Sequence, residues 1–282
     1  MRNIHWIHIA LVLVFSSNGL PNSLAQEGPT SESEGWSGAP AEERVHILLL
    51  GDSTVIGSVP RKIQPEADHL EGIVRKLLEG AGDLPPIRVT NEGRGGEFVR
   101  GLLDNRFAKI VEAQSEVDIV NIRYGLNDYG KREGFKENFV DDLTELIEKV
   151  KTDFDHPTIY LETVIVYFDE EKSAEVNALI REAAEKNSVP LIDMYARTAK
   201  EIEMGNTALT YHRVPLEKIP EQFHALLPQP WEPGEICVLD NSLDAHLRDV
   251  PDWFGDKHPN LPGYHVIASE LAQVLEPVIR AR

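Results

Sequence analysis

A serine and a histidine that could form a nucleophile and its base stand near opposite ends of the sequence. Ser53 lies in Gly51-Asp52-Ser53-Thr54, directly after the apolar run 45–50, where a glycine permits a tight turn that exposes the serine. His258 lies in Asp256-Lys257-His258, just before the last helical pattern. A serine hydroxyl needs a general base, and an imidazole beside a carboxylate is such a base. Ser53 is therefore a candidate nucleophile and His258 is its candidate base. A plain turn serine and a structural histidine are the alternatives.

Two further segments could supply hydrogen-bond donors to an oxyanion. Residues 91–97, Asn-Glu-Gly-Arg-Gly-Gly-Glu, follow the apolar run 87–90 and hold three glycines within four residues, which lets a backbone N–H approach a ligand closely. Gly125-Leu126-Asn127-Asp128 follows the run 117–124 and offers a side-chain amide. A phosphate-binding loop is the rival interpretation of the glycine segment. It lacks the third spaced glycine of a dinucleotide site, and the chain has no Walker lysine pattern.

Strand-like runs alternate with helical patterns along the chain and indicate what positions these residues. We expect strands at 45–50, 87–90, 117–124, 158–167 and 189–194. Helical spacing of apolar residues appears over 70–78, 139–150, 176–183 and 263–281, with Ser173 as the cap of the third helix. This order predicts a three-layer, doubly wound α/β fold with a mostly parallel five-stranded sheet. Ligands bind at the carboxyl ends of strands in such sheets, where the serine, glycine and asparagine segments fall.

The two ends of the expected fold differ in composition. Residues 1–25 combine Arg2, an apolar run at 7–15 and small residues before Ala25, which is typical of an export signal peptide. That run is too short to span a bilayer, which needs about 20 apolar residues. Residues 26–43 are rich in Glu, Ser, Gly and Pro and predict a flexible leader. We expect one domain over 44–282 and a soluble, exported mature protein.

Net charge, cysteine content and histidine spacing indicate which partners, crosslinks and metal sites to expect. The formal charge is −19, so the surface repels phosphate backbones and nucleic acid is not an expected partner. The single cysteine, Cys237, cannot close an intrachain disulfide and is best explained as a small apolar residue. The histidines lack metal-ligand spacing, so neither a metal nor a cofactor is expected.

Residues 201–255, called the excursion below, interrupt the alternation of strands and helices. They hold many prolines and several aromatic residues, and a connection this long in a compact domain usually has a function. We expect an ordered segment that helps to wall the site. Its aromatic side chains could stack on sugar rings or form a small local core. They are Tyr211, Phe223, Trp231, Trp253 and Phe254.

Together, the four polar segments resemble those of the SGNH, or GDSL, hydrolase family over about residues 45–281. That family has a Gly-Asp-Ser block, a glycine block, a Gly-x-Asn-Asp block and a late Asp-x-x-His block. The resemblance implies a flavodoxin-like SGNH fold, Ser53 as nucleophile and His258 as base. It also implies an oxyanion hole formed by the backbone N–H groups of Ser53 and Gly96 and by the Asn127 amide.

The histidine block departs from the family pattern. The family aspartate precedes the histidine by three residues, and that position is Gly255 here. Asp256, two residues before His258, is the carboxylate we favour, and Asp252 is the other local candidate. A backbone carbonyl could instead orient His258, which would leave a Ser-His dyad.

The family's known substrates are acyl esters of lipids, thioesters and acetylated sugars. The Gly-Asp-Ser-Thr segment resembles the nucleophile block of rhamnogalacturonan acetylesterases, and export would place the enzyme among polysaccharides. We therefore expect deacetylation of a carbohydrate. A lipolytic or general short-chain esterase is the first alternative, and a degenerate hydrolase that only binds glycan is the second.

Overall fold

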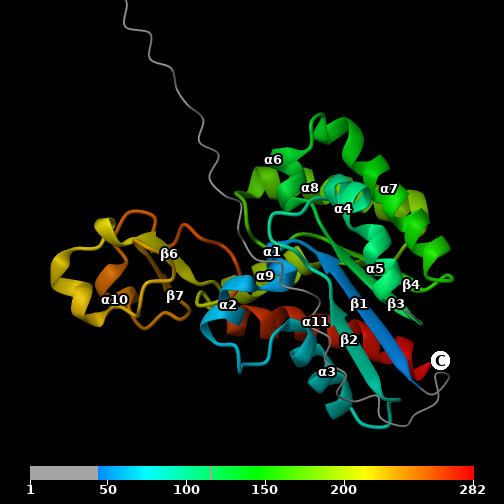
Figure 1. The fold of residues 1–282 in the computed structure, drawn as a ribbon, viewed down its shortest axis with the longest axis horizontal. Coiled ribbons are helices and arrows are strands. Elements are labelled where there is room, and N and C mark those ends of the chain that lie inside the picture. Colours follow the sequence, from blue (N-terminus) through cyan, green and yellow to red (C-terminus); the bar gives the residue numbers. More distant parts are fainter. Residues whose placement is uncertain (1–43, 115) are drawn as a thin grey trace, which may run out of the picture.

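A five-stranded parallel sheet forms the centre of the protein. The computed structural model describes residues 44–114 and 116–282, so the expected signal peptide and leader lie outside the described residues. The strand order is β2-β1-β3-β4-β5 (Figure 1). The strands are β1 (Val45–Gly51), β2 (Ile87–Asn91), β3 (Ile119–Arg123), β4 (Thr158–Glu162) and β5 (Leu191–Ile192). Because β2 and β3 lie on opposite sides of β1, the chain reverses its direction of winding there, and ligands bind beside such a switch point.

Helices cover both faces of this sheet, which confirms the predicted α/β fold (Figure 1). The residues of β1 alternate between two cores, with Leu48 and Leu50 in one and Ile47 and Leu49 in the other. This explains why the strand is apolar at nearly every position. On the first face lie α4 (Val99–Asn105), α5 (Phe107–Ala113), α7 (Phe135–Asp153) and α8 (Glu170–Asn187). On the second lie α3 (Leu70–Gly80), α9 (Met194–Glu203) and α11 (Leu261–Arg280).

The excursion forms a lobe to the side of the main sheet (Figure 1). Its elements are the antiparallel pair β6 (His212–Pro215) and β7 (Glu235–Val238), the 3₁₀ turns η2 (Leu216–Lys218) and η3 (Glu221–Leu226), and α10 (Asp244–Leu247). Trp253 is 1% exposed at the centre of a separate apolar core, against which Phe223 packs. Tyr211 and Trp231 pack in a second small cluster, whereas Phe254 is 46% exposed. Most of these aromatic side chains therefore stabilise the lobe, and Phe254 is the one available to solvent.

Two local expectations differ from the structure. Ser173 does not cap α8: the cap is Asp169, whose carboxylate accepts a hydrogen bond from the Lys172 N–H at 2.9 Å, and Ser173 is buried within the helix. Asp169 lies at the exposed start of α8, where its carboxylate can reach the free N–H groups of the first turn. Ser173 lies one turn further along, on the face of the helix that packs inward. The fourth and fifth strands are also shorter than their apolar runs, because residues after Glu162 and Ile192 leave the sheet for loops and for α9.

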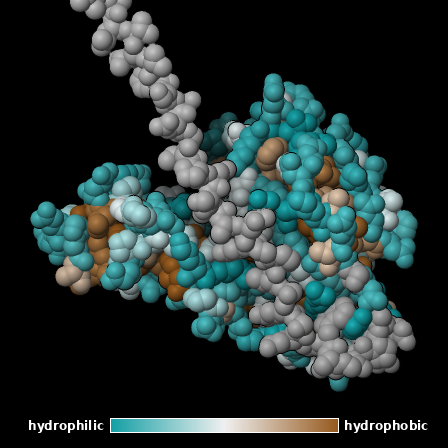
Figure 2. Space-filling view, viewed as in Figure 1, coloured by the Kyte–Doolittle hydropathy of each residue, from teal (hydrophilic) through white to brown (hydrophobic). Residues whose placement is uncertain are grey.

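The surface is mostly hydrophilic, with apolar side chains concentrated in one region. On the face drawn in Figure 2, most of the described surface is hydrophilic, and hydrophobic side chains gather on the lobe formed by the excursion. Leu226, 48% exposed, and Phe254 are exposed large apolar residues of the lobe, and Ile202 and Met204 at the start of the excursion are exposed as well. Of the helices in the described part, none combines the length and the apolar character that a membrane crossing requires.

Candidate active site

Ser53 is the first residue of a short helix that follows the central strand. The chain turns sharply between β1 and α1 (Ser53–Ile56), and Asp52 caps that helix by accepting hydrogen bonds from the Thr54 N–H and hydroxyl, both at 2.8 Å. A side chain at Gly51 could not be accommodated, since a Cβ there would lie 2.2 Å from Cγ2 of Val55. The turn therefore presents the partly exposed serine at the carboxyl end of β1.

A buried ion pair fixes the backbone beside Ser53. Arg123, at the end of β3, donates to the Thr54 carbonyl at 2.8 Å and to Glu162, at the end of β4, at 2.7 Å. Both charged side chains are only 1% exposed. Asn121 donates a further hydrogen bond to Glu162. Buried charges need such partners, so this pair ties the serine turn to two neighbouring strands.

The structure brings His258 to Ser53 across 205 residues of sequence. Ser53 Oγ lies 2.9 Å from His258 Nε2, and His258 Nδ1 lies 2.6 Å from Asp256 Oδ1. The imidazole packs against two tyrosines. Tyr211 stacks on it with ring centres 5.8 Å apart, and Tyr167 meets it at 90° at 5.2 Å. The three polar groups form the hydrogen-bonded chain that activates a serine.

The segment that carries His258 pairs with the start of the excursion. The Tyr211 N–H donates to the His258 carbonyl at 3.2 Å, and the Asn260 N–H donates to the Leu209 carbonyl at 3.1 Å. The Asn260 side chain also accepts from the Gly263 N–H at 2.9 Å and so caps α11. Backbone pairing on one side and a helix cap on the other therefore hold the histidine in place.

Of the two candidate carboxylates, Asp256 is the one beside the imidazole. Its Oδ1 also accepts the backbone N–H of His258 at 3.0 Å, and its Oδ2 lies 3.0 Å from Nε of Arg213. Burial would raise the pKa of Asp256, but the hydrogen bonds from His258 and the charge of Arg213 outweigh it and hold that pKa below its usual value. Asp252 points elsewhere: its side chain is 70% exposed and pairs with Lys218 at 2.6 Å.

The expected oxyanion donors lie in turns at the same edge of the sheet. Gly96 has a φ of 73°, a conformation that favours glycine, and within the described residues its N–H has no acceptor. The Asn127 amide donates one hydrogen to the Glu97 carbonyl at 3.1 Å, which leaves the second free. Asp128 binds the Val99 and Gly125 N–H groups, at 2.8 and 3.0 Å, and so joins the glycine and asparagine segments.

The sequence matches the GDSL-like lipase/acylhydrolase family over residues 49–266, which include the serine turn, both donor segments and the histidine. The chain belongs to this family. A match of this extent makes the protein an acyl-ester hydrolase and confirms the resemblance drawn from the four segments. Comparison of the sequence with curated proteins gives no match.

Solved structures share the fold of this GDSL-like hydrolase at low sequence identity. A lipase/acylhydrolase from Enterococcus faecalis superposes with a TM-score of 0.54 at 16% identity, covering 83% of this chain and 96% of its own. LAE5, an alpha/beta hydrolase from the metagenome of Lake Arreo, gives 0.52 at 17% identity, covering 82% and 96%. Axe2, an acetylxylan esterase from Geobacillus stearothermophilus, gives 0.52 at 16% identity, covering 81% and 93%.

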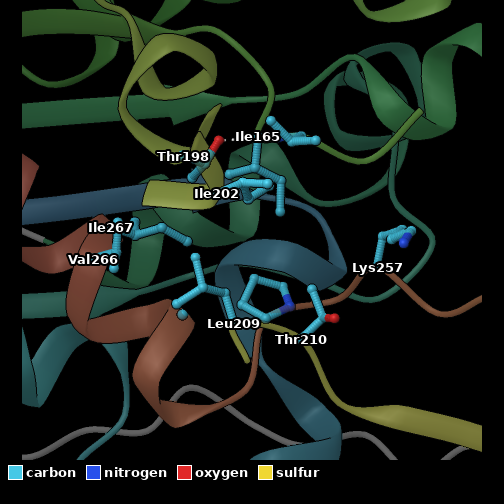
Figure 3. Close-up of a pocket in the computed structure, with 11 residues that line it drawn as sticks. Ile165, Thr198, Ile202, Leu209, Thr210, Lys257, Val266 and Ile267 are labelled. Carbon is cyan, nitrogen blue, oxygen red and sulfur yellow. Dashed lines mark hydrogen bonds between the residues drawn. The ribbon is translucent and has the colours of Figure 1, made fainter. Parts of the chain in front are cut away.

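A hollow of about 40 Å³ lies behind the histidine segment of the GDSL-like hydrolase (Figure 3). Thr210, Lys257 and Pro259 line it, each adjacent in sequence to a residue of the site. Its other walls are mostly apolar and come from α9, α11 and the loop after β4, as Figure 3 shows for Ile202, Ile267 and Ile165. In the part of the chain that the structure describes, no three potential metal ligands converge.

Three residues that contact the His258–Asp256 pair were not identified from the sequence as part of the site. Tyr167 follows the fourth strand, at the sheet edge where a site belongs, and could have been found by that position. The sequence predicts Tyr211 as a sugar platform or a core residue; it lies in the small apolar cluster and also stacks on His258. Arg213 left no sequence signal, since only the folding of β6 against the histidine segment brings it to Asp256.

Proposed function

We propose that this hydrolase is an exported serine esterase that removes acetyl groups from a carbohydrate, with Ser53, His258 and Asp256 as its triad. One observation carries the mechanism: Ser53 Oγ, His258 and Asp256 are joined by contacts of 2.9 and 2.6 Å. That geometry lets one proton move from the serine to Nε2 while the carboxylate stabilises the resulting imidazolium.

The reaction has two halves. Ser53 Oγ attacks the ester carbonyl, His258 Nε2 takes the serine proton, and the same proton is then donated to the leaving alcohol. The acyl-enzyme is hydrolysed by water, which gives its proton to His258 before the acid leaves and Ser53 recovers its hydrogen. Asp256 keeps its charge throughout and holds Nδ1–H, so that Nε2 stays free to accept.

The tetrahedral intermediates place negative charge on the former carbonyl oxygen. The backbone N–H groups of Ser53 and Gly96 and the second amide hydrogen of Asn127 are the donors that we assign to this oxygen. Loss of one such donor typically costs about 3 kcal/mol in the transition state. The Glu97 carbonyl and the Asp128 carboxylate supply the hydrogen bonds that hold these turns before substrate binds.

A carbohydrate substrate is supported by two observations. Axe2, a structural neighbour, is an acetylxylan esterase, and its catalytic mutants include replacements of a serine and of a histidine by alanine. Phe254 offers an exposed aromatic ring two residues before Asp256, and such rings stack on sugars. A lipolytic activity is the second candidate, because another neighbour is described as a lipase/acylhydrolase.

Hydrolysis of p-nitrophenyl acetate by residues 44–282 tests the serine mechanism. We expect turnover that Ser53→Ala abolishes, while Ser58→Ala, a matched change of a partly buried serine five residues away, leaves it intact. Equal turnover of wild type and Ser53→Ala would refute the assignment. If the wild type shows no turnover but still binds acetylated glycan, the protein is better explained as a degenerate hydrolase that only binds glycan.

A second assay distinguishes the substrates. The enzyme is offered p-nitrophenyl esters from acetate to dodecanoate and a panel of acetylated polysaccharides, with released acetate as the readout. Acetate release from a polysaccharide and activity that falls with acyl length are the expected results. Activity that rises with acyl length would replace the carbohydrate proposal by the lipolytic one.

Export is proposed from the sequence of residues 1–25 alone. The check is N-terminal sequencing of protein recovered from outside the cytoplasm, which should begin near Gln26. A mature protein that still begins at Met1 would contradict the proposal.

A further inference from the structure

The excursion contributes a side chain to the His258–Asp256 pair. Arg213 is the second residue of β6, and its Nε lies 3.0 Å from Asp256 Oδ2. Asp256 is 6% exposed, and Oδ1 already accepts both the backbone N–H and Nδ1 of His258. Arg213 is therefore the partner of the remaining carboxylate oxygen.

We propose that Arg213 is a positioning residue of the esterase: it orients Asp256 through Oδ2 and thereby holds His258 in the tautomer that accepts the proton of Ser53. This inference rests on the proposed serine mechanism. It also gives the excursion a role in catalysis, because the side chain reaches Asp256 only when β6 is in place.

The spacing of the histidine block explains why a positioning residue is needed. With one residue between Asp256 and His258, the carboxylate folds back onto the N–H of its own segment, so a single oxygen serves two donors. Rotation about the Cβ–Cγ bond of Asp256 would move Oδ1 away from its two donors and weaken both hydrogen bonds. A guanidinium on Oδ2 opposes that rotation, and a buried carboxylate oxygen left without a partner would be destabilising.

The backbone places Arg213 where it can act in this way. The chain from 208 to 211 pairs with the histidine segment through the Asn260 and Tyr211 hydrogen bonds, and Arg213 follows two residues later on the continuing strand. In β6, Arg213 pairs with Cys237 of β7, which keeps the strand extended. A single stretch of backbone thus supports His258 and carries the cation that contacts Asp256.

The charge states of the groups around His258 and Asp256 determine how a pH profile of kcat/KM is interpreted. Burial raises the pKa of Tyr167 and of Cys237 to about 12, and that of Tyr211 further, so these groups are neutral near pH 7. Arg213 is the cation in contact with Asp256. The titratable or charged groups that interact with the His258–Asp256 pair include Asp52, Tyr167, Tyr211, Arg213 and Cys237. Glu235 faces Arg213 itself, with its Oε2 4.0 Å from Nε.

Removing the guanidinium charge has a predictable sign. The imidazolium of His258 is repelled by Arg213 and attracted by Asp256, so loss of Arg213 stabilises the protonated imidazole. The acid limb of kcat/KM, which reports protonation of the free enzyme, therefore moves to higher pH. We expect a shift of about 0.5 to 1 pH unit, as for a single charge at a partly buried site.

Arg213→Gln, Arg213→Lys and Lys218→Gln form the variant set. Lys218 is a matched control because it lies in the same lobe, loses the same charge and pairs with Asp252 rather than with the site. For p-nitrophenyl acetate, we expect Arg213→Gln to lower kcat about tenfold with little change in KM. The acid limb should shift upward in Arg213→Gln, and Arg213→Lys should restore part of both properties.

The NMR signal of the Nδ1–H proton of His258, which lies in the 2.6 Å contact with Asp256 Oδ1, supplies a readout independent of turnover. Its chemical shift should change in Arg213→Gln and stay at the wild-type value in Lys218→Gln. An unchanged chemical shift and an unchanged kcat in a folded Arg213→Gln protein would overturn the positioning role. So would a loss of kcat without a shift of the acid limb, or equal shifts of that limb in Arg213→Gln and Lys218→Gln. A wild type without esterase activity would instead refute the proposed function, and the Nδ1–H signal would still test the contact.

Discussion

Replacing Asp256 by asparagine tests how the imidazole is oriented. In the wild type, Asp256 Oδ1 takes the Nδ1–H of His258 at 2.6 Å, so the neutral ring carries its proton on Nδ1 and presents a lone pair at Nε2 to Ser53. An asparagine amide facing Nδ1 would donate to the ring and move the proton to Nε2. That nitrogen could then no longer accept the serine proton.

The size of the effect follows from two losses. The carboxylate is only 6% exposed, so its attraction for the imidazolium formed in the transition state is weakly screened by solvent. The tautomer is also wrong in the ground state. A triad with the imidazole in the wrong tautomer typically loses about 10⁴-fold in kcat, or about 5 kcal/mol. We expect Asp256→Asn to lower kcat by about 10³ to 10⁴-fold.

The assay is hydrolysis of p-nitrophenyl acetate at pH 8, with kcat and KM determined separately and thermal unfolding as the folding control. Asp252→Asn is the matched control, because Asp252 lies four residues away, is exposed and pairs with Lys218. It should stay within about twofold of wild type, as expected for an exposed ion pair. A folded Asp256→Asn protein with near wild-type kcat would refute the triad and indicate a Ser-His dyad. A large loss in Asp252→Asn would refute the carboxylate assignment.

Two further predictions concern buried charges at the sheet edge. Glu162→Gln leaves the Arg123 guanidinium buried without its counter-charge. The free energy of unfolding, measured in urea, should therefore fall by about 3 to 5 kcal/mol. A change below about 1 kcal/mol would show that the ion pair does not stabilise the turn. Burial raises the pKa of Asp128 to about 7, against a usual value of 3.8. Between these two values the folded protein therefore holds a proton that the unfolded chain releases, and Asp128 lowers stability as pH rises, by up to about 1.4 kcal/mol per pH unit. Urea unfolding at pH 4.5 and 7 should show a smaller decline for Asp128→Asn than for wild type, and equal declines would contradict the raised pKa.

Most of the fold could be predicted from the sequence because its signals are local. The apolar run at 45–50 indicates a strand buried on both faces, and helical spacing over 70–78 indicates one covering helix. A period of two or of 3.6 residues needs no knowledge of distant contacts. The errors in the predicted ends of the strands also arise because the signals are local. The sequence does not show where β4 ends, because the apolar run continues into a loop that is also buried.

The serine, glycine and asparagine segments could be found in the sequence for a similar reason. Parallel strands place their carboxyl ends at one edge, so polar residues after successive strands are expected to meet there. His258 follows the excursion rather than a strand, and the resemblance to the GDSL family identified it. The turn at Gly51 is local as well, since the lack of space for a Cβ beside Val55 arises within five residues.

Only the tertiary structure decided which carboxylate orients the imidazole and what surrounds it. Asp256 and Asp252 are equivalent by composition, and the loop between them turns one toward Nδ1 and the other toward Lys218. Arg213 reaches Asp256 because the excursion folds back against the histidine segment, a contact between residues 43 positions apart. Sequence periodicity carries no record of such pairings. They depend on loop paths, and those are set by the packing of the whole chain.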